Sequence, residues 1–242
     1  MASERALLLI ADIGGYTEYM RTHRMSLAHA EVNTTRLLEA IIDAAGDFDL
    51  IEIEGDAAFL SLRADGFDDA ATAAAMTRAV AAMHLAFHRE RRYVASVLCP
   101  CDACEQADNL KLKFVAHVGE VATQTIRDRR KLVGIDVILV HRLLKNPVEE
   151  PEYILFSEDL YRTGGTAFDP VRELPQDLEG IGPVLTYVAG IEDVAGSLPP
   201  LPEPGWGERV GRTLGVAGRG LPYMLGLRRT RRAAAAASAA GR

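Results

Sequence analysis

Near its N-terminus the chain reads Leu7-Leu8-Leu9-Ile10-Ala11-Asp12-Ile13-Gly14-Gly15-Tyr16-Thr17. The apolar start of this stretch predicts a strand that is buried on both faces of a sheet. Asp12 and the two glycines predict the turn that ends the strand. Thr17 is a residue type that caps helices, and apolar residues at helical spacing continue from it to about Ala45. This part of the chain therefore predicts a buried strand followed directly by a long helix.

Strands and helices alternate along the rest of the chain. Leu50 to Leu62 predict a hairpin, with Gly55-Asp56 at its turn. Helices are expected at Asp68–Arg91 and Val133–Lys145. The remaining expected segments are strands at Leu110–Val121, Thr123–Ile126, Tyr153–Phe156 and Leu185–Ala189, with a charged connection at Arg127–Lys131. Alternation with hairpins favours an α/β sandwich with a mixed sheet over an all-parallel fold.

The composition is that of an ordinary soluble globular protein. Of 242 residues, 48% are apolar and 25% are charged, and this length is enough to bury a sizeable core. The apolar run at Ala6–Ala11 is much shorter than the roughly 20 residues of a membrane helix, and it is too short for a secretory signal. The three cysteines lie in one short segment, which argues against a secreted disulfide scaffold. We therefore expect a cytoplasmic protein.

Charge is unevenly distributed along the chain. Residues 201–242 contain eight Arg and two Glu, a balance of +6, so the total of −7 leaves −13 for residues 1–200. An acidic body argues against a nucleic-acid partner. Prolines from 199 to 204 mark the end of the folded part. We expect a domain over residues 1–195 and a flexible Pro/Gly/Arg/Ala-rich tail over 196–242, with an anionic membrane surface or the acidic body as alternative docking places for the tail.

Two carboxylates stand at turns next to predicted strands. Asp12 follows the first strand, and Asp56 lies at the tip of the hairpin. If these strands are neighbours, both carboxylates point into one place, where Mg²⁺ would find hard oxygen ligands and substrate phosphates would complete its coordination. Backbone N–H groups from Ile13 to Thr17 would then hold the phosphates. The alternative is a pair of solvated turn aspartates.

Five segments, in this order, resemble the class III nucleotidyl cyclase catalytic domain. They are Ile10–Thr17, Glu54–Ala57, Phe114–Val121, Gly134–Val137 with Arg142-Leu143, and Gly180–Gly182 with Thr186-Tyr187. The resemblance covers about 180 residues and implies a ferredoxin-like mixed sheet with helices on it. More closely, the chain is similar to an uncharacterised bacterial branch of the superfamily that has an Ala-Asp-Ile-x-Gly-Tyr-Thr opening and a Cys-x-Cys-x-x-Cys loop.

The resemblance also implies an activity, the conversion of GTP or ATP to a cyclic nucleotide and pyrophosphate. Two Mg²⁺ or Mn²⁺ ions would be held by Asp12, Asp56 and the carbonyl of Ile13. The segment Gly14, Gly15, Tyr16 and Thr17 would bind the nucleotide. Arg142 falls at the family's transition-state arginine. Two subunits would pack head to tail, as a homodimer or as a heterodimer with another cyclase-like chain.

Four positions bear on the base and on turnover. Glu52 falls where guanylate cyclases carry a glutamate, which can accept hydrogen bonds from guanine, although a solvated hairpin residue is the alternative. The second base-reading position holds Lys131, where the family has an aspartate or a cysteine. Ile138 and Ile181 stand where the family has an asparagine for the ribose and a lysine for the phosphates. The loss of one such contact lowers the rate roughly 10²–10³-fold. A degenerate cyclase domain that binds a nucleotide or a protein partner is therefore the alternative function.

The cysteine segment supports a third function. Cys99, Cys101 and Cys104 have a spacing at which three thiolates could bind Zn²⁺ together with a fourth ligand. A dithiol redox switch and ordinary free thiols are the alternatives. A metal- or redox-sensing protein is accordingly the third hypothesis.

Overall fold

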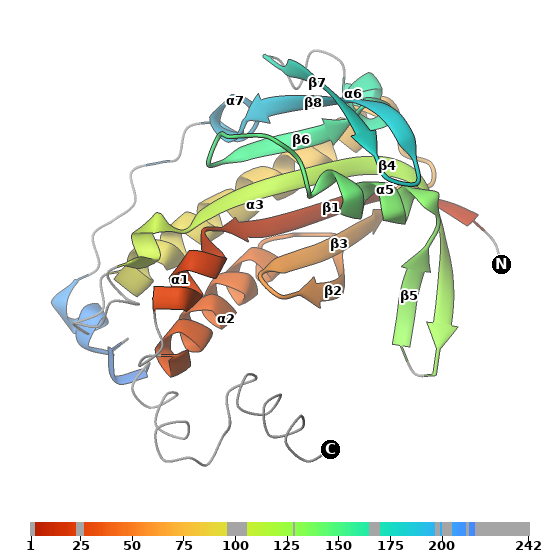
Figure 1. The fold of residues 1–242 in the computed structure, drawn as a ribbon. Helices are drawn as coiled ribbons and strands as arrows, with labels where there is room; N and C mark the ends of the chain where they lie inside the picture. The colour runs from red at the N-terminus through yellow and green to blue at the C-terminus, as the bar shows by residue number, and fades with distance from the viewer. Residues whose placement is uncertain are drawn as a thin grey trace. The chain divides into compact units, whose positions relative to one another are not determined.

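The computed structural model describes residues 3–22, 27–95, 106–127, 129–164, 170–196, 199, 205–211 and 213–215 (Figure 1). The chain divides into two compact units. The first, here called the sheet unit, comprises Met1–Gly14, Ala40–Phe87 and Lys111–Pro200. The second comprises Gly15–Glu39, His88–Leu110 and Leu201–Arg242. The boundary falls inside two of the helices.

The sheet unit is built on one mixed eight-stranded sheet with the order β2-β3-β1-β4-β6-β8-β7, and β5 pairs with β4 outside this path. The pair β4–β6 is parallel and the other pairs are antiparallel. The strands are β1 (Ser3–Gly14), β2 (Asp49–Glu54), β3 (Ala57–Arg63), β4 (Lys111–Ile126), β5 (Arg129–Val133), β6 (Tyr153–Ser157), β7 (Arg172–Leu178) and β8 (Gly182–Gly190). The prediction of an α/β fold with a mixed sheet is confirmed.

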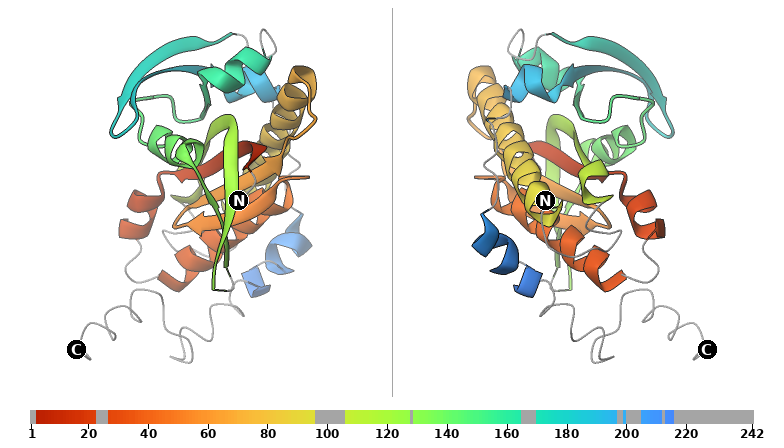
Figure 2. Two further views of the ribbon diagram at one scale, coloured as in Figure 1. Left: turned by 90° about the vertical axis from the view of Figure 1, so that its right-hand side faces the viewer. Right: turned by 90° about the vertical axis from the view of Figure 1, so that its left-hand side faces the viewer.

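The predicted buried strand is β1, the centre of the sheet. Because side chains alternate along a strand, Leu8 and Ile10 face the same side, where they join a core cluster with Val140 and Leu143 of α5 (Ile135–Leu143). The intervening residues of β1 are also buried and face the other side. Figure 2 shows α5 and the first part of α3 on opposite faces of the sheet. The apolar run is therefore continuous because helices cover both faces.

The helix α3 (Asp69–Ala95) supplies much of the second face. Four side chains at helical spacing are completely buried, namely Met76, Val80, Met83 and Phe87. By length and composition α3 could cross a membrane, but half of its most apolar window is buried inside the protein. A long core helix meets the same criteria, and the buried stripe identifies α3 as one.

Shorter helices complete the two units. The sheet unit also contains α6 (Glu158–Gly164) and α7 (Ile191–Ala195). The second unit contains α1 (Tyr16–Thr22), the 3-10 helix η1 (Gln106–Asn109) and most of α2 (Leu27–Asp43). Inside this unit Arg36 and Glu90 form an ion pair of 2.6 Å, with only 16% of each side chain exposed.

Several predicted boundaries were wrong. The helix expected from Thr17 to Ala45 is described as two helices, α1 and α2, and Thr17 lies inside α1 rather than capping it. The two strands expected between residues 110 and 126 are the single strand β4. The expected charged connection at Arg127–Lys131 contains a tight turn, with φ of 58° at Arg127, and the start of β5. Since this hairpin is largely exposed, it lacks the apolar alternation that marks a buried strand.

Candidate functional site

The two predicted carboxylates come together because β1 and β3 are neighbours. In the antiparallel register Asp12 pairs with Ala57, the residue after Asp56. The N–H of Ile13 donates a hydrogen bond of 3.2 Å to the carbonyl oxygen of Asp56, which holds the hairpin turn against the end of β1. The expectation that the two strands are neighbours is confirmed.

The surroundings of the Asp56 carboxyl favour its protonated form. Burial, followed by the nearby charge of Asp12, raises the pKa of Asp56 from 3.8 to about 6. The charge of Lys113 works in the opposite direction. A half-buried pair of carboxylates that repel each other is stabilised by any cation that reaches both.

Lys113 is the basic side chain at this site, and the sequence analysis did not identify it. It lies opposite Asp12 in the β1–β4 register, and its Nζ is 2.9 Å from Asp12 Oδ2. Burial alone would lower the pKa of Lys113, but the hydrogen bond and charge of Asp12, together with Tyr153 and Asp56, raise it. Burial has the opposite effect on the neutral acid Tyr153 and raises its pKa. The hydroxyl of Tyr153 donates a 3.0 Å hydrogen bond to Asn146 Oδ1. The site is thus two carboxylates with one ammonium group.

The donor atoms at this site fit a hard divalent cation. The carboxylates of Asp12 and Asp56 are the oxygen ligands that Mg²⁺ and Mn²⁺ prefer. Burial and, after it, the charge of Asp12 raise the pKa of Asp56, and a bound cation would offset both effects. Lys113 already neutralises one of the two charges. The residues therefore fit a bound metal ion, with less negative charge than two carboxylates alone would offer.

Glu52, the predicted base-reading residue, meets Lys131 at a neighbouring part of the sheet. Lys131 Nζ of β5 lies 3.5 Å from Glu52 Oε2 of β2, and both side chains are nearly half exposed. A cavity of about 320 Å³ lies beside this pair and is lined by Asp49, Leu50, Ile51, Lys131 and Leu132. Glu52 pairs with Phe59 in the β2–β3 register, so it emerges on the same face as Ala57 and Asp12. The structure thus brings Glu52 and Lys131 together on the face that carries the carboxylates.

The residues of α5 are held by different partners. Arg142 donates a 2.8 Å hydrogen bond to Glu179, in the turn before β8, rather than to either aspartate. Ile138 is half exposed, and Ile181 packs against the core cluster of the sheet unit. His141 lies 3.4 Å from Glu54 and makes an edge contact with Phe59. Among the described residues, no contact links Arg142 to Asp12 or Asp56.

The other predicted residues fall in the second unit or outside the described part. Gly14 is the last residue of β1, whereas Gly15, Tyr16 and Thr17 belong to the second unit. Gly15 has φ of +81°, a backbone conformation that favours glycine, and its carbonyl accepts the N–H of Tyr19. Cys99, Cys101 and Cys104 lie outside the described residues.

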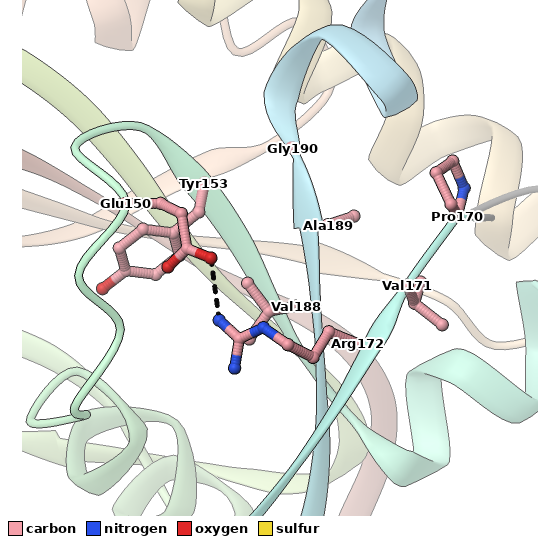
Figure 3. Close-up of a pocket in the computed structure, with 8 residues that line it drawn as sticks. All are labelled: Glu150, Tyr153, Pro170, Val171, Arg172, Val188, Ala189 and Gly190. Atoms are coloured by element: carbon pink, nitrogen blue, oxygen red, sulfur yellow. Dashed lines mark hydrogen bonds and ion pairs between the residues drawn. The ribbon is translucent and has the colours of Figure 1, made fainter.

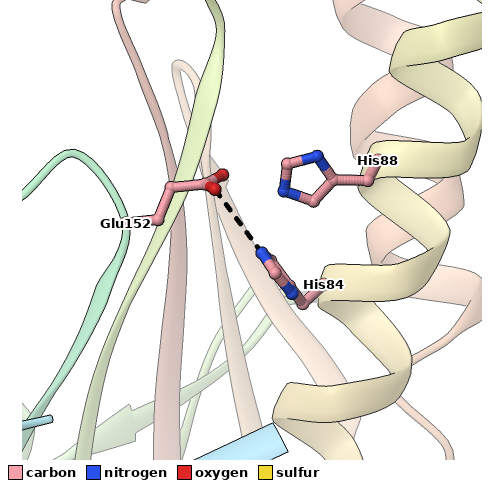
Figure 4. Close-up of side chains that lie close together, drawn as sticks. All are labelled: His84, His88 and Glu152. Atoms are coloured by element: carbon pink, nitrogen blue, oxygen red, sulfur yellow. Dashed lines mark ion pairs between the residues drawn. The ribbon is translucent and has the colours of Figure 1, made fainter. Parts of the chain in front are cut away.

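Two further groups of polar side chains lie in the sheet unit, apart from His88, which begins a segment of the second unit. In a pocket of about 290 Å³, Arg172 and Glu150 form an exposed ion pair of 2.9 Å (Figure 3). In Figure 4, His84 Nε2 points toward Glu152 Oε2 at 3.6 Å, and His88 follows His84 by one turn of α3. Glu152 also accepts the N–H of Leu112 at 2.9 Å.

Solved structures that match this fold include adenylyl and guanylate cyclase domains. The adenylyl cyclase CyaB from P. aeruginosa matches with a TM-score of 0.54 and 17% identity, over 78% of this chain and 94% of that chain. The guanylate cyclase domain of RhGC from Catenaria anguillulae, solved in complex with GTP, matches with a TM-score of 0.56 and 17% identity, over 78% of this chain and 98% of that chain. These matches show the cyclase fold that the sequence motifs predicted.

Sequence comparisons assign the chain to a family. Residues 34–153 match the model described as Protein of unknown function (DUF2652). The chain is also 36% identical over 200 residues to the Uncharacterized protein Rv2561/Rv2562 of Mycobacterium tuberculosis (strain ATCC 25618 / H37Rv), which covers 80% of this chain and 90% of that protein. At this identity and coverage, the chain belongs to the same family as the mycobacterial protein.

Proposed function

We propose that this protein is a metal-dependent nucleotidyl cyclase-like enzyme that converts GTP or ATP to a cyclic nucleotide and pyrophosphate, with slow turnover. The observation that carries the proposal is the meeting of Asp12 and Asp56 at adjacent turns, on a fold shared with cyclase domains. The two carboxylates make an oxygen-rich site, which suits a divalent ion with a bound triphosphate.

In this proposal Asp12, Asp56 and the carbonyl of Ile13 hold Mg²⁺ or Mn²⁺, and the resemblance implies two ions per site. When bound, the metal would acidify the ribose 3′-hydroxyl and neutralise charge on the triphosphate. The hydroxyl oxygen attacks the α-phosphorus and forms a new P–O bond. The bond from the α-phosphorus to the bridging oxygen breaks, pyrophosphate leaves with that electron pair, and the hydroxyl proton passes to solvent. The chain's own task is to align these groups.

The role of Arg142 is to bind phosphoryl oxygens across a dimer interface. Its forked guanidinium suits these oxygens, and it is held near the surface by an ion pair with Glu179, whose side chain is 86% exposed. An exposed ion pair is readily exchanged for a stronger partner. A homodimer, or a heterodimer with another cyclase-like chain, would bring Arg142 to the partner's carboxylates.

We propose that guanine is the preferred base. The carboxylate of Glu52 can accept hydrogen bonds from the N1–H and amino group of guanine, and the ammonium of Lys131 can donate to its O6. Because the two side chains lie 3.5 Å apart, they present acceptor and donor side by side. Adenine offers no matching pair of donors to Glu52.

The remaining features of the proposal concern the whole chain. Residues 1–195 form the cyclase-like domain and 196–242 form a tail that docks on the acidic body or an anionic membrane surface. The protein acts in the cytoplasm. It belongs to the branch of the superfamily that carries the Cys-x-Cys-x-x-Cys loop, where Cys99, Cys101 and Cys104 would hold Zn²⁺ or sense redox state.

A second candidate function is a nucleotide-binding regulatory module without turnover. Ile181 packs against the core cluster, where an ammonium group would be desolvated, and the apolar Ile138 cannot donate a hydrogen bond to a ribose. Each lost contact lowers the rate roughly 10²–10³-fold. These two positions favour binding over catalysis.

The test is to incubate the full chain with Mn²⁺ and either GTP or ATP, and to search for the cyclic nucleotide by mass spectrometry. Asp12→Ala should abolish the product, whereas Asp47→Ala, which changes an exposed aspartate in the turn before β2, should leave it unchanged. Metal-dependent nucleotide binding without product would favour the regulatory module. If neither binding nor product depends on Asp12, the shared site is wrong.

A further inference from the structure

We propose that Lys113 is a built-in cation of the carboxylate site and replaces one of the two divalent ions that the resemblance implies. The site would then bind one Mg²⁺ or Mn²⁺ per chain. This inference rests on the proposed function, because it assumes that Asp12 and Asp56 hold a metal ion.

The position of Lys113 follows from the sheet. In the antiparallel pair of β1 and β4, Asp12 and Lys113 are directly opposite each other, so their side chains emerge on the same face. Nζ of Lys113 reaches Oδ2 of Asp12 at 2.9 Å. The pairing of β1 with β4 therefore places the Lys113 ammonium beside the Asp12 carboxylate.

The surroundings make this a strong interaction. Only 13% of the Asp12 side chain and 27% of the Lys113 side chain are exposed. In a partly buried site the attraction between opposite charges is less screened than at the surface. Asp56 lies on the other side of Asp12 and also feels the charge of Lys113. The ammonium group therefore acts on both carboxylates.

The number of charges and of free carboxylate oxygens at the site favours a single divalent ion. Two carboxylates provide two negative charges, of which Lys113 balances one. A divalent ion bound to the Asp12 oxygen that contacts Nζ would lie next to the ammonium and be repelled by it. The other Asp12 oxygen and the Asp56 carboxylate remain as ligands for one ion. The observed residues thus suit a mixed set of one metal ion and one lysine.

The test measures the binding of Mn²⁺ alone to the full chain, by following the electron paramagnetic resonance signal of free Mn²⁺. We expect one Mn²⁺ per chain at the site in the wild type. Lys113→Met keeps the apolar stem and removes the charge, so it should either bind a second Mn²⁺ or lower the Kd at least tenfold. Lys113→Arg, which keeps the charge, should retain one Mn²⁺.

A matched control is available two residues away. Lys111 lies on the same strand and the same face, opposite Gly14. Lys111→Met changes the net charge by the same amount, and its Kd for Mn²⁺ should stay within threefold of the wild type. Asp12→Ala gives the background of binding elsewhere on the chain.

The outcomes separate the two proposals. Binding of two Mn²⁺ by the wild type would overturn the role of Lys113 without any lysine variant, and it would leave the metal site intact. Equal Mn²⁺ affinity and stoichiometry in wild type, Lys113→Met and Lys111→Met would also overturn the role of Lys113. The ion pair between Lys113 and Asp12 would then be structural only. Binding by the wild type no stronger than by Asp12→Ala would overturn the metal site itself.

Discussion

The imidazole of His117 and the carboxylate of Asp136 connect the centre of the sheet to the helix α5. Nε2 of His117 lies 3.2 Å from Asp136 Oδ1, and the histidine side chain is completely buried. Its Nδ1 is 2.7 Å from Ser157 Oγ at the end of β6. Asp136 Oδ2 also accepts the N–H of Glu120 at 2.6 Å. The start of α5 is thus anchored to β4 by one carboxylate, and this anchoring positions Arg142 further along the helix.

Replacement of this carboxylate should destabilise the fold. Asp136→Asn should lower the free energy of unfolding by about 1–2 kcal/mol at pH 7, because it weakens bonds to a charged acceptor. The hydrogen bond from His117, followed by that from the Glu120 backbone, lowers the pKa of Asp136 below 3.8. The lowered pKa stabilises the fold above pH 4, and this contribution is lost as the pH falls through the folded-state value.

Urea denaturation at several pH values would test this prediction. The difference between wild type and Asp136→Asn should shrink as the pH falls below about 4. Asp159→Asn is the matched control, because Asp159 also lies in the first turn of a helix but is exposed. It should change stability by only a few tenths of a kcal/mol. A difference that stays constant with pH would show that Asp136 acts without its charge.

Gly119 lies at the centre of the same network. A Cβ at this position would overlap the Asp136 carboxylate and Nε2 of His117, and both groups are fixed by their other bonds. Gly119→Ala should therefore lower the free energy of unfolding by about 1–3 kcal/mol, the usual range for overpacking. In the control Gly205→Ala the new methyl group meets open space. Thermal unfolding of the two variants would test this prediction. Equal midpoints would mean that Asp136 and His117 move aside for the new methyl group at no cost in stability.

The raised pKa of Asp56 predicts two opposite dependences on pH. Without metal, the folded state favours the protonated carboxyl, so stability should fall as the pH rises from about 4 through 6. Asp56→Asn should then raise the free energy of unfolding at pH 7.5 by about 1 kcal/mol, a value reduced to allow for screening by solvent. With metal, the affinity of the wild type for Mn²⁺ should increase as the pH rises through 6.

Chemical denaturation at several pH values, first with a chelator and then with Mn²⁺, would measure both the metal-free stability and the stabilisation by the metal. Mn²⁺ should stabilise the wild type and leave Asp56→Asn nearly unaffected. Asp47→Asn, at an exposed position in the turn before β2, should behave as the wild type in both solutions. Equal stabilisation of all three proteins by Mn²⁺ would place the metal elsewhere on the chain.

The parts predicted from sequence are those with local signals. The buried run before Asp12 and the alternating hairpin around Asp56 each carry their own period and turn residues, so β1, β2 and β3 were expected near their observed positions. β7 was not predicted, because it is an edge strand with charged residues and Pro175, which only an edge tolerates.

The parts of the site that sequence reasoning missed depend on register between distant strands. Lys111 and Lys113 alternate with apolar residues, which predicts a strand but no partner. Only the pairing of β1 with β4 places Lys113, and not Lys111, beside Asp12. The bond between His117 and Asp136 likewise joins residues whose proximity no local pattern encodes.

The pairing of Glu52 with Lys131 predicts how the protein selects its base. In the presence of Mn²⁺ the wild type should bind GTP more tightly than ATP, because guanine alone offers two donors to the carboxylate of Glu52. In Glu52→Gln the preference should fall roughly tenfold, since a neutral acceptor makes a weaker hydrogen bond. Glu54→Gln is the matched control, because Glu54 lies two residues along the same strand and pairs with His141 instead. Competition of GTP and ATP for a fluorescent nucleotide analogue would measure the ratio of the two Kd values. Equal affinities for GTP and ATP in the wild type would remove Glu52 from base recognition and leave its contact with Lys131 as a surface ion pair.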